Sequence, residues 1–400
     1  MTRSLFPFCL LLFLTACQPS TQEEAITDPP GDDDRTLRAE FVADPQPVPE
    51  REVTTLALGD AAPDFRLMGV DGRYHTLADY ADAEVLVLVF TANHCPTAQA
   101  YEQRLMDFTS DYTDRGVQVV AISPNSPLGL LYNELGYTDL GDEYVDMQVR
   151  HRDAEFNFPY LYDGDDHAAS LKYGPVATPH TFVFGPDRKL AYVGRMDKIE
   201  RPGKANAEDL RAAVDDLLAG RPVATPSTKT FGCSTKWAWK TTYKKQDSLE
   251  WASLPVDLQP LDLAGVERLT DNDSDNLRLI NLWATWCGPC VREYPDFLVL
   301  QRMYGGRNFE FVSISTDKPD QAGKARSFLE KVHSPVTNYH FTGEDVYELI
   351  EAIDPEWNGA IPYTILLAPG GEVVWSHQSD VNFLDLKRAI VEHELLGRYF

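Results

Sequence analysis

The sequence of 400 residues predicts an α/β protein with two consecutive domains, each a central mixed β-sheet flanked by helices. Two apolar runs, 85–90 and 279–284, have the length and composition of buried central strands. Each run is followed at once by a turn that contains cysteine, and then by apolar residues at helical spacing. Because this order occurs twice, we expect one architecture to be repeated.

The later elements follow the same order in both halves. An X-Pro dipeptide, Thr178-Pro179 or Ile361-Pro362, precedes an expected antiparallel pair of strands in each half, although a proline that only starts a strand is a simpler interpretation. In the first half we expect a strand at 117–123, paired strands at 182–184 and 190–193, and a helix at 210–218. The corresponding elements of the second half are a strand at 309–315, a helix at 322–332, paired strands at 364–367 and 373–376, and a helix at 384–396.

The second half carries the motif Trp286-Cys287-Gly288-Pro289-Cys290 between its first strand and its first helix. The partial positive charge of a helix N-terminus favours a thiolate, so Cys287 is predicted to be the attacking sulfur. Cys290 lies one turn further on and can resolve a mixed disulfide. Zinc binding is the alternative, but it needs two more ligands, and this half has no second cysteine pair or close histidine pair. We therefore predict a redox centre and no metal.

This motif resembles the active site of the thioredoxin superfamily. The extended pattern Cys-x-x-Cys-x-x-Glu-x-Pro, which includes Glu293, is similar to that of exported, membrane-tethered reductases of cytochrome maturation. The resemblance implies a thioredoxin-like fold, and it implies that Glu293 is the proton acceptor for Cys290, because Asn281 stands where cytosolic thioredoxins carry a buried Asp. A surface carboxylate that complements the helix dipole is the alternative role for Glu293.

The same resemblance implies that both X-Pro bonds are cis and face the cysteine turns. Thr178 and Ile361 would then offer backbone groups to an extended substrate. The predicted substrate-binding residues are Trp286, Ile361, Pro362, Thr178 and Pro179.

Cys95 occupies the corresponding turn of the first half. Its Asn-x-Cys-Pro pattern and the segments Phe158–Asp163 and Thr228–Trp237 resemble the redoxin and alkyl-hydroperoxide-reductase group, in a peroxiredoxin-like subgroup. Ala92 stands where that group has Thr or Ser to bind peroxide oxygens, and Ala98 stands where a second cysteine would be. We expect a reactive Cys95 thiolate at the helix N-terminus, with a buried, inert cysteine as the alternative.

Cys233 follows in a Lys-rich stretch. Local positive charge favours its thiolate, and it is the one unassigned partner for Cys95 in the sequence. Two interpretations stay open. Cys233 either forms a resolving disulfide with Cys95 or is a structural or free thiol.

The N-terminal segment predicts that the protein is located in the cell envelope. A short basic start and an apolar core at 5–14 end in Leu-Thr-Ala-Cys, which resembles a bacterial lipobox and implies lipidation of Cys17. The core is too short to cross a bilayer as a helix. We expect a lipoprotein that faces the periplasm, and Gln18 favours the outer membrane. The following acidic, Pro-rich segment is predicted to be a disordered tether.

The net charge of −26 argues against nucleic acid as a partner. The sequence has no Gly-rich phosphate-binding loop or other pocket-type cofactor signature, so we expect no cofactor. The predicted organisation is a signal peptide at 1–16, a tether at 17–55, a redoxin-like domain at 56–225, a connector at 226–260 and a thioredoxin-like domain at 261–400.

These features predict a membrane-anchored thiol-disulfide oxidoreductase. Its partners would be protein or small-molecule disulfides and dithiols, a membrane or periplasmic electron donor, and the membrane itself through Cys17. The first alternative is a thiol peroxidase that uses Cys95 and is reduced by the second domain. The second is a periplasmic copper-delivery module in which Cys287 and Cys290 act with His377 or His340.

Overall fold

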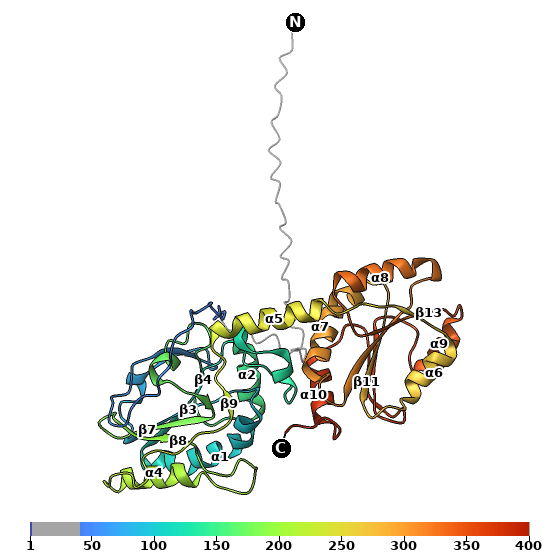
Figure 1. Cartoon of the computed structure of the whole chain (residues 1–400). Helices are drawn as coiled ribbons and strands as arrows, with labels where there is room; N and C mark the ends of the chain where they lie inside the picture. The colour runs from blue at the N-terminus through green and yellow to red at the C-terminus, as the bar shows by residue number, and fades with distance from the viewer. Residues whose placement is uncertain (2–40, 400) are drawn as a thin grey trace. The chain divides into compact units, whose positions relative to one another are not determined.

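The computed structural model describes residues 1 and 41–399 (Figure 1). The predicted signal peptide with Cys9, and the predicted lipidation site Cys17, lie outside the described residues. From residue 41 onward the described chain belongs to one compact unit. Its two large β-sheets correspond to the two predicted domains, and a third sheet has two short strands.

The first domain has a seven-stranded sheet in the order β2-β1-β5-β4-β3-β7-β8. Its central strand β3 lies parallel to β4 and antiparallel to β7, and all six side chains of β3 are buried. Helices α1 and α4 cover one face, and short α3 packs on the other. The bounds are β1 Arg66–Gly69, β2 Tyr74–Thr76, β3 Val85–Phe90, α1 Pro96–Tyr112, β4 Val117–Ser123, α2 Tyr144–Asp153, β5 Tyr160–Tyr162, α3 Ser170–Tyr173, β7 His180–Phe184, β8 Leu190–Gly194 and α4 Glu208–Leu218.

The second domain has a six-stranded sheet in the order β10-β13-β12-β11-β14-β15. Strand β11 is again central, parallel to β12 and antiparallel to β14. Helices α7, α8 and α10 cover one face, while α6 and α9 cover the other (Figure 1). The bounds are β10 Gln259–Leu261, α6 Leu263–Asp271, β11 Leu277–Trp283, α7 Gly288–Tyr304, β12 Phe309–Ser315, α8 Ala322–Lys331, β13 Thr337–Phe341, α9 Val346–Ile353, β14 Tyr363–Leu367, β15 Val373–Gln378 and α10 Phe383–Glu392.

The repeated α/β architecture is confirmed, and the predicted long strands differ from the observed ones by three residues or fewer at their ends. Both X-Pro bonds, Thr178-Pro179 and Ile361-Pro362, are cis, as the resemblance implied. Several short elements were not predicted, because strands of three residues and weakly apolar helices carry little periodic signal. Helix α10 ends at Glu392, four residues before the predicted end.

The prediction of a tether that reaches residue 55 is wrong for its described part, 41–55. The Phe41 ring lies 4.9 Å from the Tyr144 ring, and the backbone N–H of Gln46 donates to the Asp165 carbonyl at 2.8 Å. Near the end of the segment, the Thr55 hydroxyl donates to the Gly174 carbonyl at 2.8 Å. Polar groups of this segment are thus paired with loop residues of the first domain. Hydrogen bonds of this kind leave no periodic pattern in a sequence.

The predicted connector at 226–260 contains a part that belongs to the first domain and a helix that links the domains. Strand β9, Cys233–Ser234, pairs antiparallel with β6, Ala177–Thr178, of the first domain. The backbone N–H of Ala238 donates to Nε2 of His167 at 2.8 Å, so the chain is attached to the first domain up to this residue. The linking element is the following helix α5, Thr241–Ala252, which buries none of its side chains.

Replacement of Asp197 by Ala should destabilise the first domain by about 3–5 kcal/mol, because it leaves a buried guanidinium without its partner. Nη1 of Arg104 donates to both Asp197 oxygens, at 3.0 and 2.9 Å, and both side chains are at most 5% exposed. Urea unfolding would measure the loss. The matched control is Asp215→Ala, which removes the half-exposed pair with Arg115 and should cost about 1 kcal/mol or less. Equal losses in the two variants would contradict the prediction.

Candidate active site

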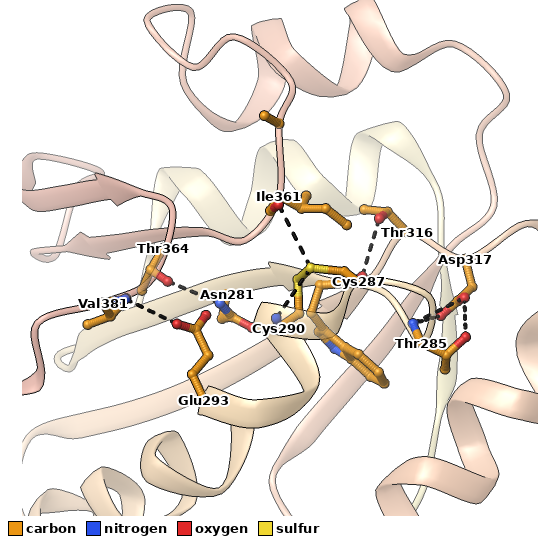
Figure 2. Close-up of a disulfide and its surroundings, with 12 residues drawn as sticks. Asn281, Thr285, Cys287, Cys290, Glu293, Thr316, Asp317, Ile361, Thr364 and Val381 are labelled. Atoms are coloured by element: carbon orange, nitrogen blue, oxygen red, sulfur yellow. Dashed lines mark hydrogen bonds between the residues drawn. A yellow bond between two sulfur atoms is a disulfide. The ribbon is translucent and has the colours of Figure 1, made fainter. Parts of the chain in front are cut away.

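The turn between β11 and α7 holds a disulfide between Cys287 and Cys290 (Figure 2). Its S–S length is 2.00 Å and the two Cα atoms lie 5.3 Å apart. Cys290 is 1% exposed and Cys287 is 5% exposed, whereas the preceding Trp286 is 66% exposed. The predicted redox pair is therefore assembled, with Cys290 shielded as expected and an aromatic side chain in solvent beside it.

Cys287 is the N-cap residue of α7. Its backbone is extended, with φ −83° and ψ 101°, and its Sγ accepts a hydrogen bond from the N–H of Cys290 at 3.3 Å. The free amides and the partial positive charge of the helix end therefore act on this sulfur. Once the disulfide is opened, the same donors stabilise Cys287 as a thiolate.

Asp317 holds the turn in place from the end of the neighbouring strand. Its carboxylate accepts hydrogen bonds from the N–H of Thr285 at 3.0 Å and from the Thr285 hydroxyl at 2.6 Å. Asp317 is 2% exposed, and Figure 2 shows it facing Thr285. Sequence reasoning missed this residue. The signal available was an acid just after the predicted strand 309–315, since the ends of adjacent parallel strands lie together.

Ile361 faces the disulfide from the loop that precedes β14 (Figure 2). Its carbonyl oxygen lies 3.8 Å from Sγ of Cys287, in the loop with the cis bond to Pro362. The structure thus brings together Cys287, Ile361 and Pro362 as predicted. Contact of these residues with a substrate stays a prediction.

Glu293 is a buried carboxyl group one turn after Cys290. It is 7% exposed, which excludes the alternative of a surface carboxylate. One carboxylate oxygen accepts a hydrogen bond from the N–H of Val381 at 3.1 Å. The other oxygen has no hydrogen-bond partner within the described residues. Burial raises the pKa of Glu293 to about 7. The group can therefore take up and release a proton near neutral pH, as a proton acceptor for Cys290 requires.

The first domain contains a second sulfur site at the corresponding turn. Cys95 is the N-cap residue of α1 and is fully buried, and its Sγ lies 3.1 Å from the Thr178 carbonyl oxygen. The N–H of Cys233 donates to the same Sγ at 3.4 Å. Of the two interpretations of Cys233 left open by the sequence, the structure shows the free thiol, since Cys95 and Cys233 are not bonded here although they are adjacent.

Asp142 and His94 form a buried pair next to Cys95. Nδ1 of His94 lies 2.5 Å from Oδ2 of Asp142, and both side chains are at most 1% exposed. Burial favours neutral imidazole, but the charge and hydrogen bond of Asp142 outweigh it and raise the pKa of His94. Burial also opposes the Cys95 thiolate, yet hydrogen bonds from Cys233 and the His94 charge lower the pKa of Cys95 to about 6. The lowered pKa favours ionisation of Cys95, and the reactivity of this thiol stays a prediction.

The described residues contain no group of three or more His, Cys, Asp or Glu side chains that could hold a metal ion. Of the two histidines considered for copper, His340 has its Nε2 2.8 Å from the Asp317 carbonyl, and the ring of His377 stacks on Trp375. Within the described part of the chain, no helix has the length and hydropathy needed to cross a membrane.

Two α/β domains, one with a disulfide at a helix N-terminus and one with a free cysteine there, have the architecture of thioredoxin-like and peroxiredoxin-like proteins. Residues 58–193 match the AhpC/TSA family, and residues 268–390 match the family Redoxin. The first domain is therefore similar to the AhpC/TSA family and the second to the Redoxin family.

Individual relatives match parts of the chain. A candidate peroxiredoxin of Mycobacterium tuberculosis is 41% identical over 78 residues, 19% of this chain and 48% of that protein. The thiol-disulfide oxidoreductase ResA of Geobacillus thermodenitrificans is 26% identical over 149 residues, 37% of this chain and 75% of that protein. A solved structure of an uncharacterized conserved protein from Geobacillus kaustophilus has 34% identity and a TM-score of 0.41, and covers 48% of this chain and 97% of its own. The chain spans about half the length of the first of these relatives.

Replacement of Glu293 by Gln should stabilise the protein at alkaline pH. The folded-state pKa of about 7 lies above the unfolded value near 4.5, so the folded state holds the proton longer and the free energy of unfolding falls as pH rises between these values. Gln does not ionise, so at pH 8 the variant should be more stable than the wild type by about 1–3 kcal/mol, with little difference at pH 4. Urea unfolding at both pH values measures this. A wild type and variant with the same pH dependence would contradict the assigned pKa.

Proposed function

We propose that this protein catalyses thiol-disulfide exchange through Cys287 and Cys290, and one observation carries the proposal. A disulfide lies at a helix N-terminus whose amide donates to Cys287, within one helical turn of a buried carboxyl group that titrates near pH 7. This arrangement provides an activated nucleophile, a resolving sulfur and a proton acceptor.

In the reducing direction, the Cys287 thiolate attacks one sulfur of a substrate disulfide and releases the other as a thiolate. Glu293 accepts the proton of Cys290, and the Cys290 sulfur then attacks Sγ of Cys287 and releases the second substrate thiol. The enzyme leaves this cycle as the Cys287-Cys290 disulfide, and an external donor must return two electrons. The reverse sequence oxidises a dithiol.

The surroundings of the disulfide favour an extended protein substrate. The Ile361 carbonyl beside Cys287 can accept a backbone hydrogen bond, and exposed Trp286 offers an apolar surface next to the sulfurs. The name of the related ResA protein, thiol-disulfide oxidoreductase, supports the same reaction. We propose protein dithiols and disulfides as substrates and an envelope electron donor as the partner that restores the dithiol.

The two sulfurs should have different roles in a test with single variants. Cys287→Ser should reduce the rate of insulin disulfide reduction at least a hundredfold, because the nucleophile is lost. Cys290→Ser should accumulate mixed disulfides on Cys287, because nothing resolves them. Turbidity assays and mass spectrometry measure the two outcomes. Insulin reduction at the wild-type rate by Cys287→Ser would overturn the assignment.

We propose that the protein is anchored at the cell envelope by lipidation of Cys17. The support is the sequence alone, namely the short apolar segment and the Leu-Thr-Ala-Cys ending. Cys17→Ser should therefore abolish incorporation of labelled fatty acid and move the protein from the membrane fraction to the soluble fraction. Retention in the membrane fraction, with detergent still needed for extraction, would contradict the proposed anchor.

A thiol peroxidase activity at Cys95 is the second candidate. The Cys95 thiolate beside the His94-Asp142 pair favours it, as does the match to the AhpC/TSA family. Ala92, which is 2% exposed, places a methyl group where that family uses a hydroxyl for peroxide. Hydroperoxide consumption by the wild type, compared with Cys95→Ser, tests this candidate.

A further inference from the structure

Backbone pairing places Cys233 against Cys95. Strand β9 pairs with β6 in the register Thr178 opposite Cys233, and the Cys233 N–H donates to Sγ of Cys95. Gly232, with φ +131°, allows this approach, because a Cβ atom there would lie 2.0 Å from the Thr178 carbonyl oxygen. The two cysteines are thus adjacent through a built feature of the fold.

One buried hydrogen-bond network links the chain that carries Cys233 to the pair beside Cys95. The N–H of Lys236 donates to the side-chain oxygen of Asn125 at 2.8 Å, and the Asn125 amide donates to Asp142 at 2.7 Å. Asp142 also accepts the N–H of His94 at 3.1 Å. The segment after β9 and the turn that holds Cys95 are therefore positioned by the same carboxylate.

The two sulfurs of this site differ in access and in charge. Cys95 is fully buried, whereas Cys233 is partly exposed. The hydrogen bond with Cys95, burial and the Cys95 charge together raise the pKa of Cys233, whereas the pKa of Cys95 is lowered. Nε2 of His94 is buried without a hydrogen-bond partner in the described residues, and the pKa of His94 is raised by Asp142, which favours a positive charge beside Cys95.

We propose that Cys95 and Cys233 form a second dithiol-disulfide couple, in which Cys233 exchanges with external thiols and the Asp142-His94 pair stabilises Cys95 as the leaving thiolate. An external thiolate attacks Sγ of Cys233, the Cys95–Cys233 bond breaks, and Cys95 departs with the electron pair. A second external thiol then attacks the external sulfur of the mixed disulfide, giving an oxidised external disulfide and Cys233, which takes a proton. Two external thiols lose two electrons, and the couple gains them.

The chemistry of exchange supports this division of roles. Thiol-disulfide exchange is faster when the attacked sulfur is accessible and when the departing thiol has a low pKa. Cys233 is the accessible sulfur, and Cys95 is the departing thiol with the lowered pKa. The couple needs neither Cys287 nor Cys290, so it is independent of the function proposed above. Asp142 and His94 are positioning residues, because they act through Cys95.

The couple can be measured in the full chain with Cys287→Ser and Cys290→Ser together, which leaves Cys95 and Cys233 as the cysteines of the described residues. The protein is equilibrated with mixtures of reduced and oxidised glutathione at pH 7, alkylated and mapped by mass spectrometry. We expect a Cys95–Cys233 disulfide whose fraction follows the glutathione ratio. Absence of that disulfide at every ratio would overturn the proposal.

Single cysteine variants in the same background identify the sulfur that exchanges. With Cys95→Ser, oxidised glutathione should form a mixed disulfide on Cys233. With Cys233→Ser, glutathionylation of buried Cys95 should be at least tenfold slower. A faster reaction at Cys95 would overturn the assigned roles, because it would make Cys95 the sulfur that external thiols reach.

The role of the Asp142-His94 pair is tested by His94→Gln and Asp142→Asn. Loss of the imidazolium charge should raise the pH at which Cys95 alkylation is half-maximal, and should shift the glutathione equilibrium up to about tenfold toward the disulfide at pH 7. Lys236, paired with Glu134, is the other charged group near the sulfurs and is unchanged in both variants.

The control is Asp163→Asn, which alters a buried carboxylate of the same domain that bonds to Ser170 instead of His94. It should leave both readouts unchanged, and circular dichroism shows which variants fold. A purely structural role for the pair would leave the alkylation pH of a folded variant unchanged. That result in either His94→Gln or Asp142→Asn would overturn the positioning role.

Discussion

Both domains depend on one constraint, which fixes a cysteine sulfur at the N-terminus of the helix that follows the central strand. Cys95 caps α1 and Cys287 caps α7, and each follows the central strand of its sheet directly. At α7 the amide of Cys290 donates to the cap sulfur, whereas at α1 the sulfur of Cys95 accepts the N–H of Cys233 from β9. Because the strand is fixed by neighbours on both sides, the helix end and its charge are held where a thiolate is needed.

The two domains complete this shared arrangement in different ways. In the second domain the partner sulfur lies in the same helix, so the cysteine pair is local in sequence, and the buried carboxyl group of Glu293 lies one turn later. In the first domain Ala98 replaces that sulfur, and β9 brings Cys233 from the other end of the domain sequence. A buried acid also anchors each turn, Asp317 in one and Asp142 in the other. The same fold thus places one cysteine pair within a single helix and another pair across the domain.

Prediction from sequence succeeded where a single physical signal was strong and local. Runs of apolar residues identified β3, β4, β11 and β12, because strands buried on both faces are mostly apolar. Prediction failed for 41–55 and for the stretch before α5. Both segments contact the first domain through backbone hydrogen bonds and isolated aromatic contacts. Such contacts involve few side chains and no repeat, so no periodic pattern records them.

The sequence by itself determined the repeated architecture and the identity and order of the helix-end cysteines, because strand composition, helical spacing and the Cys-x-x-Cys motif act within a few residues. Only the tertiary structure decided that Glu293 is buried, that Asp142 lies on His94, and that Cys233 meets Cys95. Each of these depends on chain segments 48 to 138 residues apart, or on the loop that covers Glu293. Desolvation and charge pairing, which set the reactivity of these groups, arise only when the folded sheets bring such segments together.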